Sequence, residues 1–201
     1  MVSSARLTWW MAALALALFV PLFATGGLGA FDFWWWMGAN AVALLLLSAV
    51  LDGDWRRALV DDARRGLWWK AGLGLASAVL LYGVFFLGNL LARRLFGFAA
   101  SGVDAVYALK DGVALLRVWL LIALLIGPTE ELFWRGFLQR RLGARYGKWL
   151  GLVLATLVYT GMHLASANPM LVIAAGVCGA FWGLLYLRFG SVWLNVISHI
   201  L

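Results

Sequence analysis

Two adjacent carboxylates, an arginine and two histidines are the residues of this sequence best suited to chemistry. Glu130 and Glu131 precede Arg135, and the chain contains only two histidines, His163 and His199. All five lie in or beside strongly apolar segments, where an ionisable side chain costs at least ~2.5–3.5 kcal/mol at the centre of a membrane helix. Such side chains usually face a protein interior or a wet cavity. We therefore expect these residues to assemble into one polar site.

Helix geometry predicts different surroundings for the two carboxylates. Glu131 and Arg135 are spaced i,i+4 and share a helix face, whereas Glu130 points about 100° away. Arg135 can hold Glu131 as a fixed ion pair, which leaves Glu130 free to turn toward a cavity as a general base. In the alternative, all three side chains form a salt-bridge cluster near the lipid head groups. These three residues alone do not separate the two interpretations.

A water molecule held by these groups could be activated in two ways. Glutamate and histidine could bind a divalent metal ion, or Glu130 could act as the base while His163 positions the water and shuttles the proton. The metalloprotease signature HExxH, the nucleophile elbow GxSxG and the phosphate-binding loop are all absent from the sequence. We expect neither a metal ion nor another cofactor. Each histidine alone is also consistent with a simple hydrogen bond at a helix end.

Composition places the chain among polytopic membrane proteins. It has 201 residues, of which 65% are hydrophobic and 12% charged, and a membrane-spanning helix needs about 20 apolar residues. The sequence therefore predicts an all-α transmembrane helix bundle with about six full spans plus a C-terminal partial span. We expect a single membrane-embedded domain over residues 1–201. Residues 1–125 would supply N-terminal spans and amphipathic loops, and residues 126–201 the catalytic core.

Apolar runs give the approximate span boundaries. Between them, the pattern of Asp52–Lys70 predicts an amphipathic segment on the membrane surface, and Arg93–Gly112 is expected to be a mixed loop. Pro128 can serve as the first residue of a new helix, and the expected helix Thr129–Leu142 carries the carboxylates. The last run begins near Val192 and is too short to cross a bilayer by Leu201, so we expect the natural chain to continue. The predicted spans are Leu7–Ala24, Phe31–Leu51, Ala71–Ala92, Val113–Gly127, Trp149–Leu164 and Met170–Leu187.

The basic residues predict an orientation. Net charge is +7, but the basic residues lie mainly in loops, which favours contact with lipid head groups rather than nucleic acid. With the N-terminus inside, 12 of the 16 Lys and Arg residues fall on the inner side, so the positive-inside rule predicts a cytoplasmic N-terminus. The outer set is Arg93, Arg94, Lys110 and Arg117. The one cysteine, Cys178, is expected to pack in the apolar interior as an ordinary small hydrophobic side chain.

Several of these motifs, in this order, resemble the CAAX protease and bacteriocin-processing (Abi) family of intramembrane endopeptidases. The likeness covers roughly Ile126–Leu201. It rests on Glu130-Glu131-x-x-x-Arg135-Gly136, on Tyr159-x-x-x-His163, and on Gly190-Ser191 followed by His199.

The resemblance implies a glutamate-dependent mechanism. Glu130 would be the general base on water, His163 its partner, and His199 a stabiliser of the oxyanion, while Glu131 and Arg135 hold the site together. Two positions depart from the family pattern. Tyr159 replaces the usual Phe, and the Asn or Asp expected four residues after His199 lies beyond Leu201. Asn195, one turn before His199, could replace that partner.

The leading hypothesis is therefore hydrolysis of a peptide bond near the C-terminal or membrane-anchored part of a protein or peptide. The expected partners are that substrate and the lipid bilayer. The expected location is a bacterial inner membrane, since the chain is short and shows no targeting extension. The alternative is a non-catalytic scaffold or immunity factor with the same fold. A small transporter is disfavoured because the two halves show no repeat.

Overall fold

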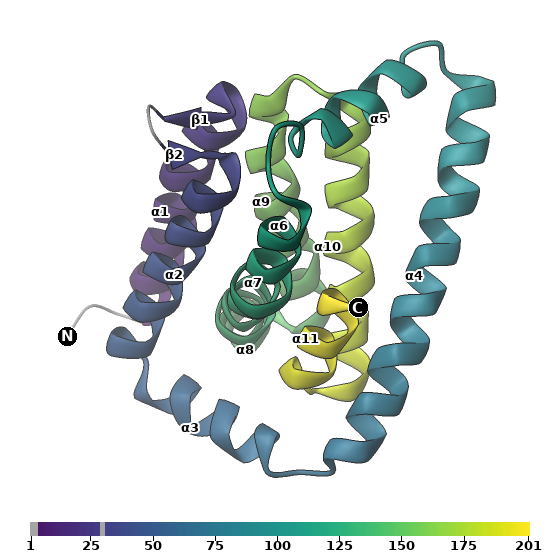
Figure 1. Cartoon of the computed structure of the whole chain (residues 1–201). Helices are drawn as coiled ribbons and strands as arrows, with labels where there is room; N and C mark the ends of the chain where they lie inside the picture. The colour runs from purple at the N-terminus through teal and green to yellow at the C-terminus, as the bar shows by residue number, and fades with distance from the viewer. Residues whose placement is uncertain (1–3, 29–30) are drawn as a thin grey trace.

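The computed structural model describes residues 4–28 and 31–201, which form a bundle of helices with one short hairpin (Figure 1). The hairpin pairs β1 (Gly27–Leu28) with β2 (Phe31–Asp32) in antiparallel register. The remaining elements are α1 (Ser4–Thr25), α2 (Phe33–Leu51), α3 (Gly53–Ala63), α4 (Leu67–Leu95), α5 (Ala99–Ala108), α6 (Leu115–Leu121), η1 (Ile122–Ile126), α7 (Gly127–Glu131), η2 (Leu132–Gln139), α8 (Arg140–Tyr146), α9 (Lys148–His163), η3 (Leu164–Ser166), α10 (Pro169–Phe189) and α11 (Val192–Ile200).

Five helical segments among the described residues are long and apolar enough to cross a membrane, and they make this an integral membrane protein of the all-α class. The expected count of six full spans plus a partial one is not confirmed. The predicted span Val113–Gly127 is not among the five, and α11 is the short final helix. The five segments are Ala5–Thr25, Phe33–Leu51, Leu67–Leu95, Lys148–Ser166 and Pro169–Phe189.

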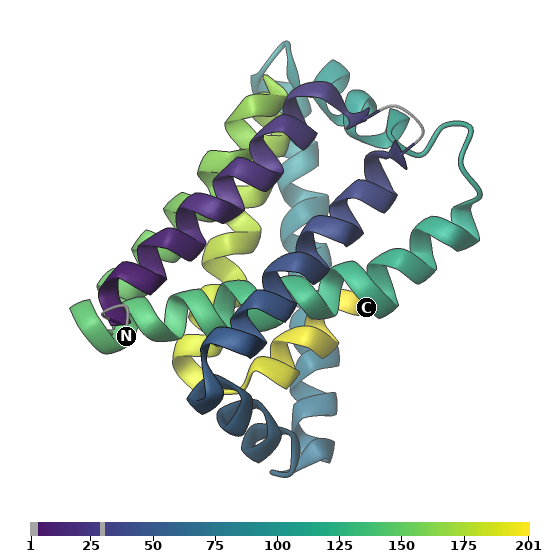
Figure 2. The same cartoon turned by 90° about the vertical axis from the view of Figure 1, so that its left-hand side faces the viewer.

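The helical run from α6 to α8 is the central element. It is seen almost end-on in Figure 1, and Figure 2 shows it crossing the other helices at a steep angle. The expected new helix at Pro128 is wrong, because Ile126 and Gly127 keep helical dihedral angles and the run continues through the proline. Proline removes a backbone N–H donor. In the same turn, the Thr129 hydroxyl donates to the carbonyl oxygens of Leu125 at 2.6 Å and Ile126 at 3.1 Å.

The two π-helical segments, η1 and η2, lie on either side of the turn that carries the carboxylates. A π-turn closes an i→i+5 hydrogen bond and is frequent at functional sites. Every residue of η2 (Leu132–Gln139) is buried, so neighbouring helices enclose this part of the central run. The run therefore forms the axis on which α2, α9, α10 and α11 pack.

The segment Asp52–Lys70 packs under the bundle, and its expected place on the membrane surface stays a prediction. Trp55 is buried and meets Phe137 edge-on, with ring centroids 6.1 Å apart. Lys70 belongs to α4, is fully buried, and pairs with Asp62 at 2.7 Å. The same Asp62 carboxylate accepts the backbone N–H of Val192 at 2.9 Å, at the start of α11. Helix α3 thus ties α2, α4 and α11 together at one end of the bundle, here called the α3 end (Figure 1).

The opposite end, here called the α5 end, contains the hairpin, α5 and η3 (Figure 1). The expected loop Arg93–Gly112 is wrong in part, because it contains the helix α5. Arg117 pairs with Asp32 there, and Asp32 also caps α2 by accepting N–H groups of Trp34 and Trp35 at 3.1 Å. These contacts fix the start of the central run against the start of α2.

Candidate active site

The central run positions three of the five candidate residues in the protein interior. Glu130, Glu131 and Arg135 are 3%, 0% and 2% exposed. Helices α2 and α11 pack on α7, and α9 and α10 pack on η2. A buried charge requires a partner or a change of protonation state. The contacts of each side chain therefore show how it is accommodated.

Glu131 is the most heavily hydrogen-bonded group of the cluster. Its Oε1 accepts from Arg135 Nη1 at 2.7 Å and from His199 Nδ1 at 2.9 Å. Its Oε2 accepts from the side-chain amide of Asn195 at 3.2 Å. The predicted Glu131–Arg135 pair is present. Both oxygens of Glu131 are therefore hydrogen-bonded, to three donors in all.

Arg135 links the central run to α9 and α10. Its Nη2 donates to the carbonyl oxygens of Cys178 at 3.2 Å and Gly179 at 3.3 Å. The guanidinium also lies between two aromatic rings, 5.3 Å from the centroid of Tyr159 and 5.5 Å from that of Trp182. Cation–π attraction is strongest where water is excluded. These contacts satisfy a buried positive charge and bring three helices to one point.

His199 is held against the cluster by a stacked indole. Its ring lies 3.9 Å from that of Trp182 with an interplanar angle of 19°. Because an ionised Glu131 carboxylate can only accept, Nδ1 of His199 carries the proton it donates. The other nitrogen, Nε2, lies 3.9 Å from Glu130 Oε2. That distance is too long for a direct hydrogen bond but suits a bridging water molecule.

Glu130 differs from Glu131 in having an unused oxygen. Its Oε1 is buried and has no hydrogen-bond partner among the described residues. Unpartnered buried polar atoms are uncommon in native proteins and often mark a functional group or a site for water. Glu130 is thus the carboxylate of the pair with an oxygen that no described residue hydrogen-bonds.

His163 lies one helical turn beyond Tyr159 on α9 and belongs to a neighbouring contact network. Its Nδ1 donates to the Tyr159 carbonyl oxygen at 2.8 Å, and its ring lies 4.2 Å from that of Phe23. Within residues 4–28 and 31–201, no hydrogen bond or ion pair joins His163 to Glu130. The structure therefore brings Glu130, Glu131, Arg135 and His199 together directly. It connects His163 to them only through Tyr159.

Three further residues, Asn195, Tyr159 and Trp182, contribute to the site, and they differ in how clearly the sequence alone indicated them. Asn195 was visible through its i,i+4 spacing to His199, and its amide also donates to the Trp182 carbonyl oxygen at 2.7 Å. Tyr159 was visible only as part of the motif shared with His163. Trp182 carried no signal, because a tryptophan within an apolar helix is ordinary core composition.

Two cavities of the described structure lie away from Glu130. One, of about 450 Å³, is at the α3 end. The other, of about 530 Å³, is an apolar groove between α2 and the start of the central run. The described residues also contain no group of three or more His, Cys, Asp or Glu side chains placed to hold a metal ion.

Comparison with known proteins gives a family for this part of the chain. Residues 112–201 match the family model described as type II CAAX prenyl endopeptidase Rce1-like. The searches of curated proteins and of solved structures returned no match. The matched range contains all five candidate residues and every contact of the cluster described above, apart from that between His163 and Phe23. Residues 112–201 of this chain are thus similar to the Rce1-like type II CAAX prenyl endopeptidase family.

Proposed function

We propose that the protein is an intramembrane endopeptidase that hydrolyses a peptide bond near the C-terminal or membrane-anchored part of a protein or peptide substrate. Glu130 takes a proton from a water molecule, and the resulting hydroxide attacks the scissile carbonyl carbon. The proton then passes to the leaving amine as the C–N bond breaks. His163 positions the water and shuttles the proton in this scheme.

The observation that carries the proposal is the contrast between the two adjacent carboxylates. Both oxygens of Glu131 accept hydrogen bonds, from Arg135, His199 and Asn195, whereas Glu130 keeps an oxygen without a partner among the described residues. A general base needs a lone pair within reach of the water it activates. The family match supports hydrolytic chemistry for the same segment.

His199 is suited to stabilise the oxyanion of the tetrahedral intermediate. Its Nδ1 is engaged by Glu131, and its Nε2 is directed toward Glu130. As an imidazolium it carries N–H donors on both nitrogens. It can then remain bound to Glu131 while Nε2 donates to the developing negative charge, where preorganised donors contribute most to catalysis. Glu131, Arg135 and Trp182 act in this scheme as positioning residues.

Cleavage by purified protein tests the proposal. Glu130→Ala and His163→Ala should each abolish cleavage of membrane-anchored peptides while the protein still inserts and folds. Asp61→Ala, which removes an exposed carboxylate on α3, is the matched control and should remain active. A parallel reaction with a chelator separates the two water-activation schemes, because loss of activity would favour a metal ion. Retained cleavage in both alanine variants would contradict the proposal.

A second candidate function has one observation in its favour. No hydrogen bond or ion pair joins His163 to Glu130 in the described structure, and Glu130 is 3% exposed. A chain that kept the fold without hydrolysis, as a membrane scaffold or immunity factor, would tolerate both features. Such a protein would bind its partner equally well with Glu130 replaced by alanine and would release no peptide product.

For its location we propose a bacterial inner membrane with the α3 end in the cytoplasm and with the central run as a sixth, steeply tilted crossing. The basic residues support this orientation, because most of them lie at the α3 end, in α3, in α8 and at the adjoining ends of other helices. A cysteine placed at the exposed Asp54 on α3 should react with an impermeant maleimide only in inside-out vesicles. A cysteine at Asp111, near the α5 end, should react only in right-side-out vesicles or intact cells. The reverse pattern would contradict the orientation.

A further inference from the structure

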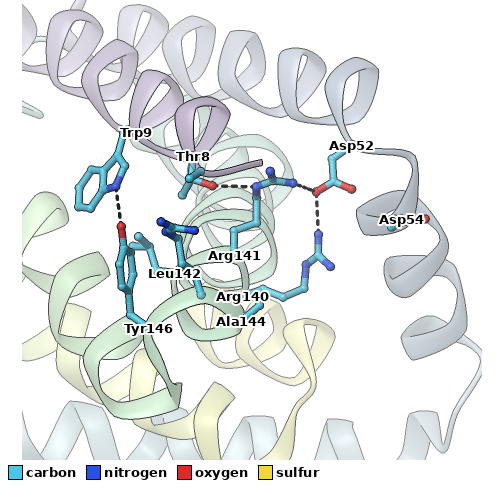
Figure 3. A pocket seen from close by; sticks show the side chains of 11 residues that line it. Thr8, Trp9, Asp52, Asp54, Arg140, Arg141, Leu142, Ala144 and Tyr146 are labelled. Atoms are coloured by element: carbon cyan, nitrogen blue, oxygen red, sulfur yellow. Dashed lines mark hydrogen bonds and ion pairs between the residues drawn. The ribbon is translucent and has the colours of Figure 1, made fainter. Parts of the chain in front are cut away.

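The cavity at the α3 end is lined by charged and aromatic side chains that the proposed chemistry does not use. It has a volume of about 450 Å³, within the range of small-ligand pockets. Figure 3 shows its wall, where the start of α1, the α2–α3 junction and α8 meet. The residues used below are Thr8, Trp9, Asp52, Arg140, Arg141, Arg145 and Tyr146.

Positive charge exceeds negative charge in this cavity. Asp52 Oδ2 accepts from both Arg140, at 2.8 Å, and Arg141, at 2.6 Å, as Figure 3 shows. One carboxylate therefore serves two guanidiniums. Arg145, which is exposed, adds a third cation to the lining. The other acidic residue of the lining, Asp54, is mostly exposed and pairs with Arg57 at 3.5 Å.

Hydrogen-bond donors remain available at the cavity wall. A guanidinium has five N–H donors, and the hydrogen bonds of Arg140 in the described structure use Nε, to the Gly136 carbonyl oxygen, and Nη2, to Asp52. Its Nη1 is thus left to a ligand. The planar fork of arginine matches the oxygens of a phosphate group. A phosphate at this position would balance the excess charge and occupy these donors.

Aromatic residues place the cavity at the depth of lipid head groups. The Trp9 indole N–H donates to the Tyr146 hydroxyl at 3.2 Å at the cavity edge (Figure 3). Three more tryptophans near the α3 end, Trp10, Trp68 and Trp149, are 71%, 87% and 66% exposed. Exposed tryptophan and tyrosine gather at the membrane–water interface. Lipid phosphates occupy this same level, so a lipid is the phosphate source nearest to the site.

We infer that this cavity binds the phosphate-bearing head group of an anionic phospholipid, between α1, the α2–α3 junction and α8. Arg140 and Arg145 supply the charge-assisted donors. Arg141 completes the wall, fixed by Asp52 and by Thr8 at 2.9 Å. The bound lipid would join the first span to the end of the central run. This inference does not depend on the proposed hydrolysis.

Lipid binding to the full chain tests it directly. The protein in a neutral detergent is titrated with phosphatidylglycerol, phosphatidylcholine or inorganic phosphate, and the bound species are counted by native mass spectrometry. Wild type should bind phosphatidylglycerol at least tenfold more tightly than the other two. Arg145→Glu should weaken phosphatidylglycerol binding at least tenfold, because it removes one charge and adds a repulsive one. Arg145 is exposed, so its replacement leaves the Asp52 contacts in place.

Arg188→Glu is the matched control. This residue is also exposed, is close to the α3 end in the last turn of α10, and does not line the cavity. The affinity of the Arg188→Glu variant for phosphatidylglycerol should stay within twofold of that of wild type. An equal loss in both variants would overturn the inference in favour of general surface attraction. Binding of inorganic phosphate as tight as that of the lipid would overturn it in favour of a free anion. Equal affinity for the two phospholipids would also overturn it.

Discussion

At the scale of single residues, the site depends on two neighbouring glutamates with different surroundings. Their sequence positions predicted this difference, because Arg135 follows Glu131 by one helical turn and Glu130 by more. The Glu131–Arg135 ion pair is confirmed. The role of Trp182 could not be predicted, because stacking on His199 depends on how α10 and α11 pack and leaves no periodicity in the sequence.

Removing one member of the Glu131–Arg135 pair should be more damaging than removing both. Glu131→Gln or Arg135→Met alone leaves the other charge buried without its partner, at a cost of about 3–5 kcal/mol. The double variant should recover a large part of that loss, because no charge then remains unpaired. Denaturant unfolding in detergent micelles measures the free energy of unfolding of wild type, the two single variants and the double variant. Strictly additive losses would show that the two side chains are not coupled.

At the scale of elements, close helix contacts set the position of His199. Helix α4 reaches α11 at Gly74, where a Cβ atom would lie 2.6 Å from Ile197 Cγ2 and 3.2 Å from the Leu194 carbonyl oxygen. These atoms belong to the helix that carries Asn195 and His199. A change in the distance between α4 and α11 would therefore move the side chains of Asn195 and His199 in the site. This contact could not be predicted, because nothing in the sequence shows which glycine of α4 meets a neighbour.

Gly74→Ala should reduce the rate of cleavage at least tenfold, because α11 must shift away from α4 and carries His199 with it. Gly83→Ala on the same helix is the control. A Cβ there meets nothing within 4 Å, and alanine is favoured over glycine in a helix by about 1 kcal/mol. Initial cleavage rates of the two variants, at equal amounts of inserted protein, make the comparison. Equal rates for both would show that α4 does not position α11.

Asp52 is the contact that joins α2 and α3 to α8. Burial raises its pKa, but the Trp55 backbone N–H and the Arg141 guanidinium lower it by more, so that the pKa lies below its usual value. Arg140 adds a further lowering effect. A carboxyl whose pKa is lowered by folding stabilises the folded state above its unfolded pKa, near 3.9. That contribution is lost as the pH falls through the folded pKa.

Asp52→Asn should therefore lower the free energy of unfolding by about 1.5–3 kcal/mol at pH 7, since charge-assisted hydrogen bonds are lost while an asparagine can still cap α3. The difference from wild type should persist down to about pH 4 and close below it. Thermal unfolding in detergent across this pH range measures the gap. Asp54→Asn, at a mostly exposed side chain, should be neutral. A gap that stays constant to pH 2 would contradict this assignment.

At the scale of the whole molecule, hydropathy predicted the membrane class, and five of the six expected full spans correspond to long apolar helices, because burial in lipid demands long apolar runs. It did not predict the central run. A proline usually starts or ends a helix, but here the helical backbone continues through Pro128. Hydropathy also could not show that α3 packs under the bundle, since an amphipathic pattern is the same for a helix on lipid and one packed against protein.

The relative placement of Glu130 and His163 is likewise a property of the whole molecule. The motif order predicted that both belong to one site, but the structure separates them by the Tyr159 turn of α9. Their cooperation in hydrolysis therefore requires a water molecule or a substrate between them. This makes the identity of the base the central claim of the account.

Hydrolysis in ¹⁸O-labelled water tests that claim most directly. Membrane-anchored peptides are incubated with wild type and with Glu130→Gln in lipid nanodiscs, and products are identified by mass. The glutamine variant should fold, because one oxygen of Glu130 has no partner to lose. Wild type should release fragments with ¹⁸O in the new C-terminal carboxylate. The rate of this release should be at least 10²-fold lower for Glu130→Gln, which is the lower end of the range for loss of a general base. Labelled product at the wild-type rate from Glu130→Gln would contradict the account.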